Sequence, residues 1–220
     1  MRSQITGEQW LNSKEKRAFD ITVMSVITPL LGAASVLGAT MFFIENGINP
    51  IFIQQRLGKG NEKMNVLKLR SMPFVQDQAD SSYGIKDERA TRVGRVLRTL
   101  ALDEAPQLLH IINGHMSIVG PRPLLKTDIV KTRELLGMND RDVWDRSRLI
   151  AKPGWLSGFG NLSRSLEPQS EEYLLARVEH DCAYAETASL AEDIGIINGA
   201  LGIGSRLLKP ETRQTELTTG

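Results

Sequence analysis

The longest feature of the polarity pattern is an uncharged segment near the N-terminus, Ile21–Ile44. Helical residues rise about 1.5 Å each, so this segment would extend about 36 Å as a helix. The hydrocarbon core of a bilayer is about 30 Å thick. The segment is therefore long enough and apolar enough to form a membrane helix.

Pro29 interrupts this apolar segment. Proline removes a backbone donor and bends a helix, and the hydroxyl of Thr28 can bond backbone groups freed at such a break. Arms of about 12 Å before Pro29 and 24 Å from it onward would each be too short to cross a bilayer alone. The pattern therefore predicts a helix-break-helix at Thr28 and Pro29.

Basic residues flank the apolar segment on both sides. They are Arg2, Lys14, Lys16 and Arg17 before it, and Arg56, Lys59 and Lys63 after it. Lys and Arg favour the cytoplasmic side of a membrane, and a hairpin that enters and returns leaves both flanks there. We therefore expect a re-entrant hairpin. A straight span, a buried core helix and a cleaved signal peptide remain the alternatives.

The rest of the chain has the pattern of a compact domain with more helix than strand. Ile51–Ile53 and Met64–Arg70 look like short strands joined by a turn at residues 58–61, and the polar segment Gln76–Glu88 predicts a surface loop. Helices are expected in two pieces over Thr91–Asn113, with a stop at Gly114, and over Thr127–Leu136 and Glu171–Ala191. Gly120-Pro121-Arg122-Pro123 cannot be helical. Ile194–Leu208 predicts either a core helix or an interfacial one.

These patterns together predict an α+β fold that is mostly helical. Residues 1–48 would form an N-terminal segment and the re-entrant membrane helix. Residues 49–210 would form a compact cytoplasmic domain with few short strands and interfacial helices, and residues 211–220 a polar tail.

Composition narrows the possible functions. The 220 residues include 27 Lys and Arg against 26 Asp and Glu, so the net charge of +1 gives no electrostatic reason to expect nucleic-acid binding. One cysteine excludes an internal disulfide framework, and one cysteine with three scattered histidines does not supply a zinc site.

The candidate chemistry lies between Lys86 and Arg122. Basic residues recur every third position, at Lys86, Arg89, Arg92, Arg95 and Arg98. They form either a solvated helix surface or a positive wall for phosphates or anionic headgroups.

Two carboxylates, Asp103 and Glu104, follow directly, with Pro106 suited to a first helical turn and Asp103 to an N-cap. Ordinary capping explains this pattern. The functional alternative is an aspartate nucleophile that attacks phosphorus beside a glutamate that holds a divalent cation.

Several ordered motifs resemble those of the bacterial sugar transferases, the monotopic phosphoglycosyl transferases. The central blocks are Asp103-Glu104-x-Pro106-Gln107-Leu108 and residues 116–124, Met-Ser-Ile-Val-Gly-Pro-Arg-Pro-Leu. The other blocks are Lys16-Arg17-x-x-Asp20, residues 50–58, Lys68-Leu69-Arg70-Ser71-Met72, residues 91–98, Lys152-Pro153-Gly154 and Arg177-x-x-x-Asp181-x-x-Tyr184. The resemblance extends from about Lys16 to Lys209.

The resemblance implies a monotopic enzyme of the bacterial cytoplasmic membrane with its active site on the cytoplasmic face. Such an enzyme moves a sugar 1-phosphate from a UDP-sugar to a polyprenyl (undecaprenyl) phosphate and releases UMP, through a covalent aspartyl-phosphosugar intermediate. This step begins the synthesis of a polysaccharide or a glycoprotein glycan. Membrane lipids are the other expected partners, and a homodimer is left open.

The resemblance also implies roles for individual residues. Asp103 would be the nucleophile, Glu104 would be tied to Mg²⁺, and Arg122 would bind phosphate. Lys68, Arg70 and Arg98 match further basic positions and are expected to bind phosphate. The chain departs from the family pattern at Thr28, where serine is common, at Ala101, where serine is common, and at His115, where aspartate is common.

Two other functions remain open. A Mg²⁺-dependent, membrane-associated phosphohydrolase could use the same aspartate and pass the intermediate to water. A non-catalytic membrane-tethered module would need the carboxylates only as caps. The identity of the sugar, the prenyl length and the pathway are not fixed by the sequence.

Overall fold

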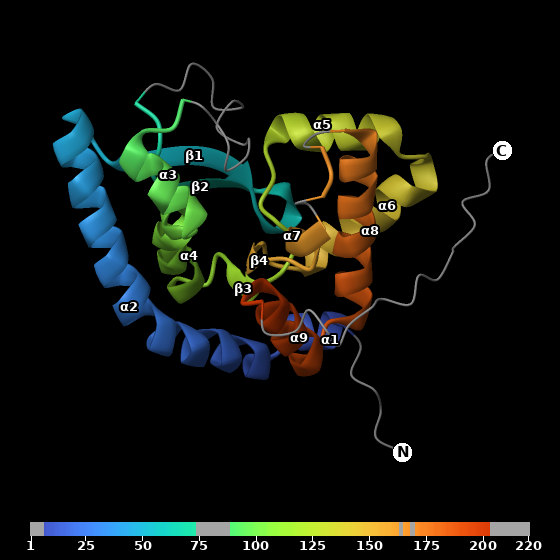
Figure 1. Ribbon diagram of the computed structural model, residues 1–220. Helices are drawn as coiled ribbons and strands as arrows, with labels where there is room; N and C mark the ends of the chain where they lie inside the picture. Colours follow the sequence, from blue (N-terminus) through green and yellow to red (C-terminus); the bar gives the residue numbers. More distant parts are fainter. Residues whose placement is uncertain (1–6, 74–88, 163–164, 168–169, 203–220) are drawn as a thin grey trace.

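The computed structural model describes residues 7–73, 89–162, 165–167 and 170–202. Within these ranges the fold is mostly helical, with two small sheets (Figure 1). A long helix curves around one side of a body that carries the remaining helices and both sheets. The expected mostly helical fold with few short strands is confirmed.

The N-terminal part consists of α1 (Gly7–Leu11) and α2 (Lys14–Asn46). The hydroxyl of Ser13 caps α2 by accepting a hydrogen bond from the backbone N–H of Lys16. Gly47 ends the helix with a φ of 67°, a left-handed conformation that glycine adopts without steric cost, and its N–H donates to the carbonyl of Phe43.

The expected helix-break-helix is not what the structure has at Thr28 and Pro29. Helix α2 runs without interruption through Pro29 and is bent (Figure 1). A proline in a helix removes one N–H donor, and the bonds of the neighbouring turns are sufficient to continue the helix through a bend. The hydroxyl of Thr28 is buried without a hydrogen-bond partner, so the prediction that it bonds freed backbone groups is wrong.

Most apolar side chains of α2 do not pack inside the protein. Val26, Leu30 and Ile44 are each about three-quarters exposed, at 75%, 75% and 76%. Only 11% of the most apolar stretch of α2 is buried, although its length and composition suit a membrane span. The alternative of a buried core helix is therefore excluded.

The predicted strand pair is present. Strands β1 (Ile51–Leu57) and β2 (Lys63–Leu69) pair antiparallel, with Gln54 opposite Val66, and the turn between them contains the 3₁₀-helix η1 (Lys59–Asn61). The predicted loop Gln76–Glu88 lies outside the described residues.

The next segment forms α3 (Arg92–Thr99), the 3₁₀-helix η3 (Leu102–Gln107) and α4 (Leu108–Ile112). The prediction of helix in pieces is confirmed, and Gly114, with a φ of 80°, follows the last piece. Asp103 is not the N-cap. It lies in the first turn of η3, because the N-cap is Ala101, two positions earlier than expected, where φ is 53°.

A second sheet and five helices complete the body. They are β3 (Ser117–Val119), α5 (Lys126–Leu135), α6 (Met138–Ile150), β4 (Gly154–Leu156), α7 (Phe159–Leu162), α8 (Glu171–Thr187) and α9 (Leu190–Ala200). Strands β3 and β4 are parallel. Gly120 and Gly154 pack backbone against backbone, so neither position has room for a side chain. This contact joins the Gly-Pro-Arg-Pro block to the Lys-Pro-Gly block.

The first turns of α2 are fixed to the body by buried charges. Lys16 Nζ lies 2.8 Å from Asp193 Oδ2 and 3.2 Å from Asp20 Oδ1. Tyr184 Oη donates to Asp193 at 2.7 Å, and Ser117 Oγ donates to Asp20 at 2.9 Å. We call these five residues the anchor cluster. It connects α2 with β3, α8 and α9.

Candidate active site

Three predicted site residues meet in one ion-paired group. Lys68 comes from β2, Glu104 from η3, and Arg122 from the loop after β3. Glu104 Oε1 lies 3.1 Å from Lys68 Nζ and 2.6 Å from Arg122 Nη2. The side chain of Arg122 remains 40% exposed, so its guanidinium can reach a ligand as well as Glu104. The fold therefore gathers these residues from three separate parts of the sequence.

The charge of Glu104 is secured by its neighbours. Burial raises the pKa of this carboxyl, but the guanidinium of Arg122 and the ammonium of Lys68 hold it well below its ordinary value. In return, the charge of Glu104 raises the pKa of Arg122. Glu104 is consequently an anion throughout the physiological pH range.

Asp103 has the opposite environment. It lines a small pocket together with Lys68, Arg70, Arg98 and aromatic Phe52. Burial, and then the charge of neighbouring Glu104, raises its pKa to about 6. Within the described residues, no hydrogen bond holds its carboxylate. Asp103 is thus a carboxylate that is unbonded, desolvated and close to cations, which favours reaction with an electrophile.

Two further predicted phosphate ligands line the same pocket. Arg98, in the last turn of α3, donates from Nε to Ser71 Oγ at 2.8 Å. Arg70 donates from Nε to the carbonyl of Asn49 at 3.1 Å, and its guanidinium lies 5.6 Å from the ring centre of Phe52. We call the pocket of Asp103, together with the ion-paired group of Glu104, the dyad pocket. All four residues predicted to bind phosphate therefore lie in or beside the dyad pocket.

Backbone strain precedes the two carboxylates. Ala101 adopts a left-handed conformation, with a φ of 53°, which costs a residue with a Cβ about 1 kcal/mol or more. The turn leads directly into η3, which packs against α2, α3 and β2. The strained turn at Ala101 leads the chain into η3, and Asp103 therefore lies beside β2 and α3 instead of at the start of a longer helix.

Sequence reasoning gave Gln54 no role, and gave Arg56 none beyond that of a basic residue flanking the apolar segment. Arg56 is buried and donates to Gln54 Oε1 at 2.9 and 2.6 Å and to the carbonyl of Pro123 at 3.0 Å. Burial, and then the nearby Arg122 charge, lowers its pKa to about 10. Arg56 therefore fixes the loop that presents Arg122. The Gln-x-Arg spacing was the sequence signal that could have indicated this pair, because residues two apart in a strand point to the same face.

His115 does not belong to this site. It makes an edge-on ring contact with His110 at 6.5 Å between centroids, and Nε2 of His110 accepts a hydrogen bond from the backbone N–H of Leu67 at 3.3 Å. Neither histidine lines the pocket of Asp103.

The carboxylates of the site suit a cation that takes most of its ligands from water and substrate. No three His, Cys, Asp or Glu residues gather in a metal-binding group within the described ranges. Both basic contacts of Glu104 end on Oε1, which leaves Oε2 for a cation. Mg²⁺ is commonly held by one or two carboxylates with waters and substrate phosphates, and Asp103 and Glu104 can supply that number.

Comparison with known proteins identifies the family. The model of the bacterial sugar transferase family matches residues 11–203, which include both carboxylates and every basic residue of the site.

This chain is a bacterial sugar transferase.

Two curated relatives carry names that state their substrates. The chain is 31% identical over 184 residues to the UDP-N-acetylgalactosamine-undecaprenyl-phosphate N-acetylgalactosaminephosphotransferase of Aeromonas hydrophila, covering 83% of this chain and 41% of the relative. It is 34% identical over 185 residues to the UDP-glucose:undecaprenyl-phosphate glucose-1-phosphate transferase of Caulobacter vibrioides, covering 83% of this chain and 66% of the relative. The bacterial sugar transferase described here thus spans less than two thirds of each of these two relatives.

Proposed function

We propose that this chain transfers a sugar 1-phosphate from a UDP-sugar to undecaprenyl phosphate. The observation that carries the proposal is the pairing of an unbonded Asp103 with an ionised Glu104 inside a ring of four basic side chains. The names of the relatives support the same donor and acceptor classes.

The first chemical step follows from this arrangement. An oxygen of Asp103 attacks the phosphorus that bears the sugar, a bond forms between them, and the bond from that phosphorus to the bridging oxygen breaks, so that UMP leaves. In the second step an oxygen of undecaprenyl phosphate attacks the same phosphorus and frees Asp103. A covalent route lets one small site serve two bulky substrates in turn.

The basic residues offset the charge that this reaction brings together. Arg122 is held by Glu104 and by the loop that Arg56 fixes, so its guanidinium is positioned for a phosphate oxygen before substrate arrives. Lys68, Arg70 and Arg98 surround Asp103 itself. Mg²⁺, bound by Oε2 of Glu104 with Asp103 nearby, would screen the repulsion between carboxylate and diphosphate.

The membrane placement that we propose is re-entrant. The first turns of α2 are tied to β3 and α9 by the anchor cluster. At its other end, Glu45 accepts hydrogen bonds from the backbone N–H groups of Arg92 and Val93 at 3.1 and 3.2 Å. Because both ends are bonded to the same polar body, a helix that enters and leaves one membrane face, bent at its middle, agrees better with these contacts than a straight span.

Cysteine labelling tests this placement. Cys182 is first replaced by serine, and single cysteines are then introduced at Glu15 and Gln55, which are exposed before and after the apolar segment. Both should be labelled only from the cytoplasmic side. Labelling of one of them from outside would replace the hairpin with a span.

A panel of UDP-sugars with Mg²⁺ tests the function. UMP release that requires undecaprenyl phosphate supports transfer. Release that is independent of the lipid would instead establish a phosphohydrolase. Absence of release from every donor in a broad panel would favour a non-catalytic module.

A further inference from the structure

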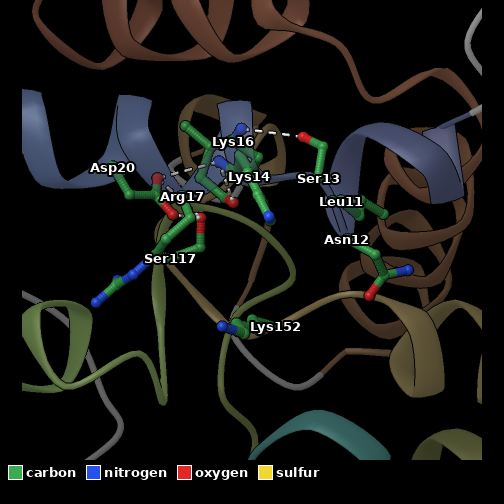
Figure 2. Close-up of a pocket in the computed structure, with 10 residues that line it drawn as sticks. Leu11, Asn12, Ser13, Lys14, Lys16, Arg17, Asp20, Ser117 and Lys152 are labelled. Carbon is green, nitrogen blue, oxygen red and sulfur yellow. Dashed lines mark hydrogen bonds and ion pairs between the residues drawn. The ribbon is translucent and has the colours of Figure 1, made fainter.

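A second pocket lies at the start of α2 (Figure 2). Its lining includes Lys14, Lys16 and Arg17 from α2 and Lys152 from the segment before β4. The dyad residues Asp103 and Glu104 are not part of it. We call it the root pocket.

Two cations of the root pocket approach the same point. A Cβ built on Gly114 would lie 3.7 Å from Nη2 of Arg17 and 3.9 Å from Nζ of Lys152. Burial, and then the charges of Arg17 and Lys59, lowers the pKa of Lys152. Like charges held this close repel each other, and an anion between them would remove the repulsion.

The acid of the lining does not balance these cations. Asp20 is already bonded to Lys16, to the hydroxyl of Ser117 and to the backbone N–H of Ile118. Among the described residues, Arg17 donates only to carbonyl oxygens, those of Ile111 and Ile112. Within the part of the chain that the structure describes, neither Lys14 nor Lys152 has a carboxylate in ion-pair contact. The root pocket therefore holds surplus positive charge.

The position of the pocket indicates which anion it meets. Most of its residues occupy the first turns of α2 and the segment just before it, and the exposed apolar part of the same helix begins directly afterwards, at Ile21. If α2 lies in the membrane as proposed above, the root pocket lies at the depth of the lipid headgroups. Basic residues at this depth attract anionic phospholipids.

We propose that the root pocket binds the phosphate of an anionic membrane phospholipid. The site is separate from the dyad pocket, so the lipid bound there is not consumed by transfer. It would hold the first turns of α2 at the headgroup level, while the anchor cluster connects those turns to β3, the strand that precedes the loop of Arg122.

Soluble short-chain lipids test the proposal without a bilayer. The full chain in neutral detergent, carrying Asp103→Asn so that no transfer occurs, is titrated calorimetrically with dihexanoyl phosphatidylglycerol, dihexanoyl phosphatidylcholine and inorganic phosphate. We expect phosphatidylglycerol to bind more tightly than the other two. Lys152→Gln and Lys14→Gln should each weaken its binding about fivefold, and the double variant about twenty-five-fold.

The matched control is Lys131→Gln, which removes the same charge from an exposed position on α5, on the other side of the body (Figure 1). This variant should bind phosphatidylglycerol as the unsubstituted chain does. Equal losses in the control and in Lys152→Gln would overturn the proposal, as would equal affinity for the two lipids. Binding of inorganic phosphate that depends on Lys152 and exceeds lipid binding would replace the lipid by a soluble phosphate. None of these outcomes bears on UMP release, so the proposed transfer is judged separately.

Discussion

The anchor cluster and the dyad pocket use the same residue types for opposite purposes. Asp20 and Asp193 are buried, and each accepts hydrogen bonds from more than one partner, including Lys16. Asp103 is close to cations too, but no hydrogen bond within the described residues holds its carboxylate, and its pKa is raised to about 6. The two anchor carboxylates are satisfied by hydrogen bonds, whereas Asp103 of the dyad pocket is not.

This difference separates structural from reactive charges. A buried ion pair whose hydrogen bonds are complete gains little by meeting a further ligand, but it is costly to break. A desolvated carboxylate without hydrogen bonds keeps its lone pairs available and is stabilised when an electrophile or a cation arrives. Asp20 and Asp103 both belong to family motifs, yet only their surroundings distinguish their roles.

Among the substitutions proposed here, Asp103→Asn should have the largest effect on activity. Loss of the nucleophilic oxygen should lower the rate of UMP release about a thousandfold or more. The fold should remain intact, because the substitution removes a carboxylate whose ionised form is disfavoured by burial. Asp142→Asn, at an exposed position of α6, is the control and should keep full activity. Appreciable turnover by Asp103→Asn would rule out attack by this residue.

Lys16→Met should have its main effect on stability. It leaves Asp20 and Asp193 buried without their cation, and removal of one partner from a buried ion pair costs about 3–5 kcal/mol. Denaturant unfolding in detergent measures this loss, with Lys131→Met as the exposed control. A loss no greater than that of the control would mean that the anchor cluster does not hold α2.

Glu104→Gln tests the boundary between the two kinds of charge, because Glu104 is paired like the anchor residues but lies in the reactive site. The amide keeps the shape and loses the anion, so Arg122 and Lys68 lose their shared partner. We expect activity to fall about a hundredfold and the Mg²⁺ titration to shift to higher concentration. The exposed Glu134→Gln serves as control. An unchanged Mg²⁺ titration would contradict the metal role.

The pH dependence should be the smallest of these effects. Asp103 attacks only when ionised, and its pKa is raised to about 6, so kcat/KM should rise with pH through that value and level off above it. At pH 5 about a tenth of the carboxyl would be ionised. Asp103 should dominate this limb, because the pKa of Glu104 lies well below the range. A flat profile from pH 5 to pH 8 would be incompatible with the raised pKa of Asp103.

Local patterns predicted the elements that depend on neighbouring residues. The strand pair around residues 58–61, the stop at Gly114 and the helix near Thr127–Leu136 follow from turn residues and periodicity, and the structure has all of them. Helix α6 and the parallel pair β3 and β4 were not predicted. Each of those strands has three residues and pairs across more than thirty positions, so no local period marks it.

The course of α2 at Pro29 was predicted wrongly for a related reason. A proline within a helix removes one backbone hydrogen bond. Whether the helix then breaks or only bends also depends on what its two ends contact. Here Asp20 holds one end and Glu45 the other, across distances in sequence that no pattern shows. The motif resemblance named the two carboxylates and the four basic residues of the site. Only the structure shows that Glu104 is paired, while Asp103 has no hydrogen bond within the described residues.

The central claim is that the unsatisfied carboxylate, and not a satisfied one, reacts with phosphorus. The direct measurement is mass spectrometry of the enzyme quenched in acid during turnover of its UDP-sugar donor, before acceptor lipid is added. We predict a peptide that contains Asp103 with the mass of one sugar phosphate added, and no such adduct in Asp103→Asn. An enzyme that releases UMP to its lipid acceptor, yet never carries this adduct on Asp103, would contradict the account.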